Sequence, residues 1–284
     1  MDRLIGLARG EDPDLAVADD YTIDQGWEAY TDAEHAVWRT LFRRQVEMLP
    51  GRAVPAFVDG LRDLAFSDDG IPHFGRLNEV LHKRTGWQVV AVPGLVPDDV
   101  FFDHLANRRF PSGNFIRKPD ELDYLEEPDV FGHVPLLMNP VFADYMQAYG
   151  EGGLRALGLG LLDKLARLYW YTIKFGLMRI PDGLRIYGAG IVSSRAESLF
   201  SLASSSPNRL GFDLLRLLRT DYRIDDFQES YFVIDSFEQL LELAEIDFAP
   251  VYERLAGLAD LQPGDVLDSD TVLHRGDRSY HGGI

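Results

Sequence analysis

The sequence of 284 residues contains no cysteine. Disulfides, thiolate metal sites and cysteine nucleophiles are therefore excluded. A chain without disulfides fits a reducing compartment, and we expect a cytoplasmic protein. The sequence also lacks an apolar run near the ~20 residues of a membrane span. Its first residues, Met1-Asp2-Arg3-Leu4, are neither basic nor followed by an apolar stretch, so we expect no signal peptide and no membrane partner.

Basic residues are in the minority. The chain has 28 Lys and Arg against 46 Asp and Glu, a net charge of −18 at pH 7. A phosphate backbone needs a basic surface, so this balance argues against nucleic acid as a partner. It favours solubility and says little about the fold. Aromatic residues are plentiful, with 4 Trp, 12 Tyr and 17 Phe, and suit the packed core of one large domain.

Composition divides the chain into a central domain and two polar ends. Residues 1–26 are acidic and contain Pro and Gly, so we expect a flexible arm. Residues 27–263 are expected to form one domain, followed by a loose tail over 264–284. No internal repeat or low-complexity tract interrupts this order.

Local patterns predict a mainly α fold with a few short strands. Thr31-Asp32-Ala33-Glu34 and Ser236-Phe237-Glu238-Gln239 have the capping-box form and predict that a helix begins at each. The strongest helical periodicity extends from Leu161 to Met178. The predicted helices are 31–48, 54–64, 75–83, 161–178, 236–244 and one that begins at 97, and the predicted strands are 87–92 and 185–187.

Two short stretches carry most of the functional information. The first is Glu127-Pro128-Asp129-Val130-Phe131-Gly132-His133-Val134-Pro135, and the second is Tyr169-Trp170-Tyr171-Thr172-Ile173-Lys174-Phe175-Gly176-Leu177. Together they resemble the iron site of the pterin-dependent aromatic amino acid hydroxylases, most closely the bacterial phenylalanine 4-hydroxylases. That family reads E-P-D-x-x-H-D-x-x-G-H-x-P and Y-W-x-T-V-E-F-G-L, and both histidines and the last glutamate are its iron ligands.

The resemblance extends over most of the chain, from about Trp38 to about Val251. Val92-Pro93-Gly94-Leu95-Val96-Pro97-Asp98 and Tyr187-Gly188-Ala189-Gly190-Ile191-Val192-Ser193-Ser194 also look like the bacterial enzymes. It implies the single-domain catalytic fold of that family. The extra regulatory and tetramerising segments of the animal enzymes are lacking, so a monomer is expected.

The resemblance also implies the chemistry and the residues that carry it. In the family, tetrahydrobiopterin and dioxygen react at Fe(II), and the oxidant formed hydroxylates phenylalanine to tyrosine. By motif, Arg117 matches the arginine that pairs with the substrate carboxylate. Other matched positions are, in the substrate pocket, Trp170, Phe175 and Ser193, and at the pterin, Phe101 with the backbone of Gly94, Leu95 and Val96. The partners implied are therefore small molecules, an aromatic amino acid and a pterin.

Two of the three implied iron ligands are missing. His133 matches the second histidine, but four residues that would include the first are absent between Asp129 and Gly132. Lys174 stands at the carboxylate position, where a protonated ammonium repels a divalent cation. We therefore expect iron to bind weakly or not at all. Pterin binding stays open, because the acidic residue that contacts pterin followed the missing histidine.

A substitute ligand set is one alternative. Asp129 and His133 are four residues apart, on one helical face, and Glu197 is an acid expected near the pocket. In the plainer interpretation, Asp129 caps a shortened helix and Glu197 lies outside any ligand set. Two functional hypotheses follow. One is an inactive or severely impaired hydroxylase scaffold that retains aromatic amino acid binding. The other is an active phenylalanine 4-monooxygenase with a rearranged iron site.

Overall fold

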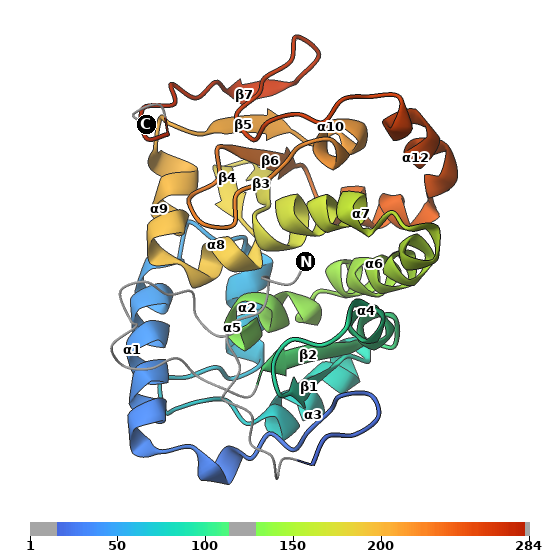
Figure 1. Ribbon diagram of the computed structural model, residues 1–284. Helices are drawn as coiled ribbons and strands as arrows, with labels where there is room; N and C mark the ends of the chain where they lie inside the picture. The colour runs from blue at the N-terminus through green and yellow to red at the C-terminus, as the bar shows by residue number, and fades with distance from the viewer. Residues whose placement is uncertain (1–15, 114–128, 282–284) are drawn as a thin grey trace.

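The computed structural model describes residues 16–113 and 129–281. Two sheets lie at opposite ends of the molecule, with helices between and around them (Figure 1). The smaller sheet pairs β1 (Gln88–Val92) with β2 (Arg109–Gly113) in parallel. The larger has the strand order β4-β3-β6-β5-β7. Its strands are β3 (Leu177–Ile180), β4 (Gly183–Ile186), β5 (Asn208–Gly211), β6 (Ser230–Ile234) and β7 (Val272–His274).

Helices make up most of the described chain. They are α1 (Asp32–Met48), α2 (Pro55–Asp63), α3 (Phe74–Thr85), α4 (Asp98–Ala106), α5 (Asp129–His133), α6 (Pro140–Leu159), α7 (Leu162–Tyr169), α8 (Ala189–Ser193), α9 (Arg195–Ala203), α10 (Leu214–Leu218), α11 (Phe237–Leu241) and α12 (Phe248–Ala256). Short 3₁₀ segments are Trp27–Ala29, Val134–Met138 and Glu242–Glu245, and Trp170–Lys174 is a π-helix. None of the helices in the described ranges is long and apolar enough to cross a bilayer.

The predicted start of α1 is confirmed at the level of single hydrogen bonds. The Glu34 amide donates to the Thr31 hydroxyl at 3.3 Å, and the Thr31 amide donates to the Glu34 carboxylate at 2.8 Å. The second predicted capping box is wrong. Ser236 makes no side-chain cap, and the Gln239 side chain accepts from the amide of Asp235 instead.

The helix predicted over 161–178 ends early, which corrects that prediction. Its regular part stops at Tyr169, the π-helix continues to Lys174, and Leu177 begins β3. The cause lies at Gly176, whose carbonyl accepts from the amides of Tyr187 and Gly188. A Cβ at Gly176 would lie 2.1 Å from the Tyr187 ring, so the chain turns here in a space that only glycine fits. The apolar periodicity of the sequence continues through this turn, and it therefore did not indicate where the helix ends.

Helix α6 was not predicted. It packs against both α4 and α11. Its contact with α4 is close: a Cβ on Gly153 would lie 1.9 Å from the ring of Phe102. Gly158, further along the same helix, has open space around it.

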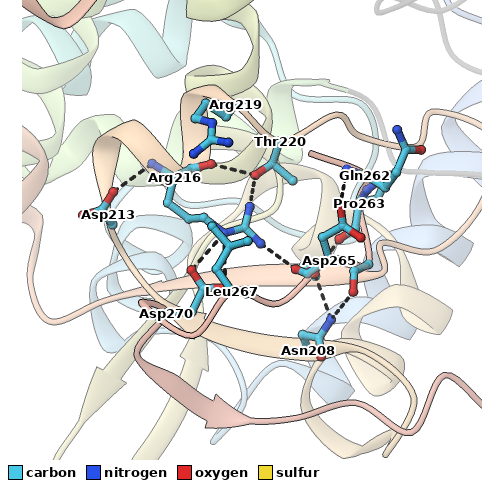
Figure 2. Close-up of polar contacts among 12 residues, drawn as sticks. Asn208, Asp213, Arg216, Arg219, Thr220, Gln262, Pro263, Asp265, Leu267 and Asp270 are labelled. Atoms are coloured by element: carbon cyan, nitrogen blue, oxygen red, sulfur yellow. Dashed lines mark hydrogen bonds and ion pairs between the residues drawn. The ribbon is translucent and has the colours of Figure 1, made fainter. Parts of the chain in front are cut away.

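The segment expected to be a loose tail makes specific contacts. A buried cluster around Arg216 binds residues 265–270 to α10 (Figure 2). The Arg216 guanidinium donates to both carboxylate oxygens of Asp270, at 2.9 and 3.1 Å, to the Asp265 carbonyl and to the Thr220 hydroxyl. The side chains of Arg216 and Asp270 are 5% and 3% exposed. Further on, Tyr280 and His281 bond to Asp226 and Phe227.

Candidate functional site

His133 ends the short helix α5 and is buried. Its ring stacks on Phe110, with centroids 5.0 Å apart. Nδ1 lies 3.1 Å from the Asp129 carbonyl, which only accepts, so Nδ1 carries the proton. Nε2 is then the free acceptor, and the Tyr169 hydroxyl donates to it at 3.2 Å. The one nitrogen of His133 able to bind a metal is thus already engaged by Tyr169.

The imidazole of His133 is neutral at neutral pH. Burial lowers its pKa to about 4; the Asp129 charge opposes this shift, and the Lys174 charge adds to it. Lys174 belongs to the π-helix that directly follows Tyr169, the residue that bonds to His133. A neutral imidazole is the form that binds metals.

Lys174 is the last residue of the π-helix and is 9% exposed. Its ammonium lies 5.5 Å from the centroid of the Trp170 ring, within the range of a cation–π contact. The position that carries a carboxylate ligand in the family motif is therefore occupied by a buried cationic side chain.

Glu197 lies on α9 and is held by residues before and within β6. The Tyr231 hydroxyl and the Gln228 amide both donate to its Oε1. Burial raises the pKa of Tyr231 well above its ordinary value, and the Glu197 charge adds to this. Within the described residues, no three His, Asp or Glu side chains form a group able to hold a metal ion. Asp129, His133 and Glu197 belong to that part of the chain and do not form such a group.

Of the residues matched to the substrate pocket, Trp170 and Phe175 contact one another. Trp170 and Phe175 are buried, with ring centroids 4.8 Å apart. Ser193 ends α8 and packs on α5: a Cβ added at Gly132 would lie 2.4 Å from the Ser193 hydroxyl. Arg117 lies outside the described residues.

Of the residues matched to the pterin site, Phe101 contacts Tyr169. Phe101 on α4 meets the Tyr169 ring edge-on at 6.1 Å, so Phe101, Tyr169 and His133 form a continuous aromatic row. Leu95 is 47% exposed, whereas Gly94 and Val96 are buried. Sequence reasoning did not identify Tyr169 as the partner of His133, nor Tyr222 and Gln228 as partners of Trp170.

Comparison with known proteins places this arrangement in a family. The model of the biopterin-dependent aromatic amino acid hydroxylases matches residues 18–254. The chain belongs to this family. Hydroxylases of the same family include the phenylalanine-4-hydroxylase of Caulobacter vibrioides, 64% identical over 279 residues, which cover 97% of this chain and 94% of the relative. The phenylalanine-4-hydroxylase of Ralstonia nicotianae is 62% identical over 91% of this chain and 84% of its own length.

Solved hydroxylase structures give the same result. The crystal structure of phenylalanine hydroxylase from Chromobacterium violaceum bound to cobalt has a TM-score of 0.89 at 55% identity, over 92% of this chain and 96% of that one. The predicted fold, a mainly α single domain of the hydroxylase catalytic type with a few short strands, is confirmed.

Proposed function

We propose that this chain is a phenylalanine 4-hydroxylase-like protein whose iron site is disrupted. It is inactive or severely impaired as a hydroxylase and retains binding of an aromatic amino acid. The observation that carries the proposal is the buried ammonium of Lys174 at the position of the family's carboxylate ligand.

The donor set does not fit Fe(II). Such iron sites use two imidazoles and one carboxylate on one face, which together neutralise part of the metal charge. Of the three motif positions, only His133 offers a ligand, and its acceptor nitrogen bonds to Tyr169. At ~4 Å and an effective dielectric of ~20, an ammonium opposes a divalent ion by roughly 8 kcal/mol, twice the value for two unit charges. A single neutral imidazole carries no charge to offset that repulsion.

Unlike the iron ligands, the residues matched to the amino acid pocket are all present in the sequence. The burial of Trp170, Phe175 and Ser193, and the contact between the rings of Trp170 and Phe175, support retained binding of an aromatic side chain. The proposal includes a cytoplasmic monomer with its hydroxylase-like domain at 27–263. Pterin binding at Phe101, Gly94, Leu95 and Val96 is expected to be weakened.

Three measurements on the full chain test the proposal. Calorimetry with Fe(II) and Co(II) under anaerobic conditions reports metal binding. A tetrahydrobiopterin-dependent assay reports conversion of phenylalanine to tyrosine, with the Chromobacterium violaceum enzyme as positive control. Calorimetry with phenylalanine reports the pocket. No stoichiometric metal, no tyrosine and saturable phenylalanine binding are expected.

The opposite results are equally informative. One metal ion per chain with coupled tyrosine formation would refute the proposal and favour an active monooxygenase with a rearranged site. Asp129, His133 and Glu197 would then be the residues to replace. Absence of phenylalanine binding would refute only the retained pocket.

A further inference from the structure

The indole of Trp170 is held from three directions. Tyr222 stacks on it, with centroids 4.2 Å apart and planes 18° from parallel. Phe175 lies against it at 4.8 Å. The indole N–H donates to the side-chain oxygen of Gln228 at 2.9 Å. The two rings fix the plane of the indole, and the hydrogen bond fixes its rotation within that plane.

Gln228 is built so that only its oxygen can face the indole. The residue is 1% exposed and lies in the loop between α10 and β6. Its Nε2 donates to the carbonyls of Arg223 at 2.8 Å and Asp226 at 3.4 Å. A flipped amide would set its N–H groups against the indole N–H and its oxygen against two carbonyls. The orientation of this side chain is therefore determined by its surroundings.

The same residue contacts a second side chain of the site. The Gln228 backbone amide donates to Oε1 of Glu197 at 3.4 Å, and Glu197 also accepts from Tyr231. Gln228 thus connects the loop before β6 to α9 and to the π-helix. Through its backbone N–H and its side-chain oxygen, this one buried residue sets the relative placement of Glu197 and Trp170.

We infer that Gln228 is a positioning residue that sets the selectivity of the pocket for a planar aromatic side chain. It acts through Trp170 and the Phe175 ring packed against the indole, by fixing the two aromatic side chains as one wall of the pocket. This inference rests on the proposed retention of amino acid binding. A saturated ring of similar size, as in cyclohexylalanine, gains less from a fixed aromatic surface than phenylalanine does.

The test uses the full chain with Gln228→Met, which keeps the side-chain length and removes the amide. Gln147→Met is the matched control, because the side-chain amide of Gln147 is also hydrogen-bonded through both its oxygen and its nitrogen, but to Arg108 and Ala106 instead. Trp170→Phe, which has no indole N–H, provides the second background. Calorimetry measures the affinities for phenylalanine and cyclohexylalanine in all variants.

Gln228→Met is expected to weaken phenylalanine binding by up to about tenfold, because the ligand must then order an indole that the hydrogen bond held in place. It should weaken cyclohexylalanine binding less, so that the selectivity falls. In the Trp170→Phe background, adding Gln228→Met should leave the selectivity unchanged. An equal loss of selectivity in both backgrounds would overturn the inference, because the effect would not pass through the indole.

A second readout does not need a bound amino acid. In ¹⁵N-tryptophan spectra, the indole signal of Trp170 is the one absent from Trp170→Phe. We expect this signal to shift and to lose exchange protection in Gln228→Met but not in Gln147→Met. An unchanged signal would overturn the inference. If the parent chain binds no phenylalanine, retained amino acid binding is refuted, and this signal alone decides whether Gln228 positions Trp170.

Discussion

The buried ion pair between Arg216 and Asp270 allows a quantitative prediction. Arg216→Met keeps the apolar stem and removes the guanidinium, which leaves the Asp270 carboxylate 3% exposed without its cation. Removing one partner of a buried pair costs about 3–5 kcal/mol. The Leu267 amide still donates to Asp270 at 2.9 Å, so we expect a value near the lower end of that range. This is a large part of the ~5–15 kcal/mol that stabilises a typical domain.

A double-mutant cycle separates the pair from its surroundings. Asp270→Asn removes the charge and keeps an acceptor, and the double variant leaves no unpaired charge. Urea unfolding followed by tryptophan fluorescence and circular dichroism gives the free energy of each variant. We expect the destabilisation of the double variant to be at least ~2 kcal/mol smaller than the sum of the destabilisations of the two single variants.

The control is the exposed pair of Arg179 and Asp235. Its side chains are 56% and 63% exposed, and the same cycle should give a coupling of less than ~1 kcal/mol. Additive effects at Arg216 and Asp270, within ~0.5 kcal/mol, would refute the reasoning. They would mean that the two charges contribute to stability independently of one another.

Three shorter predictions follow from other sites. Lys174→Glu alone should give no tetrahydrobiopterin-dependent tyrosine formation, since the first histidine is still missing; appreciable turnover would mean that the ligand set is misassigned. Gly153→Ala should destabilise the protein by ~1–3 kcal/mol in urea unfolding, because its Cβ meets a phenylalanine ring, whereas Gly158→Ala should be neutral or stabilise it by up to ~1 kcal/mol. A hydrogen bond from Arg167 lowers the pKa of Asp260 from 3.8 to about 2, so its stabilisation is complete above pH ~4 and is lost as the pH falls towards 2. Asp260 is 41% exposed, so Asp260→Asn should cost no more than ~1 kcal/mol at pH 7, and a difference that persists at pH 2 would contradict the assignment.

Patterns that act within a few residues predicted local structure well. The capping box at Thr31 was predictable because both of its bonds join residues three apart. The end of α7 was not, because the turn at Gly176 depends on Tyr187, a contact made by the fold. The box at Ser236 failed for a local reason, because the Gln239 side chain accepts from the amide of Asp235, one residue before Ser236.

The candidate site shows the same difference between local patterns, which were predictable, and contacts made by the fold, which were not. Motif spacing was enough to select His133, Lys174 and Trp170, because their neighbours in the chain carry the resemblance. Spacing alone did not reveal that Tyr169 bonds to His133 or that Gln228 bonds to Trp170. The second of these pairs is 58 residues apart, and only the packing of the loop before β6 on the π-helix brings it together.

The π-helix at Trp170–Lys174 has a consequence for any attempt to repair or transplant this site. All five of its residues are buried, which a regular helix at the edge of a core does not achieve. The wide turn changes the direction in which every later side chain leaves the axis. A glutamate grafted at the corresponding position of an ideal helix would therefore aim elsewhere, and a design that copies the motif must copy the widened turn and the glycine that follows it.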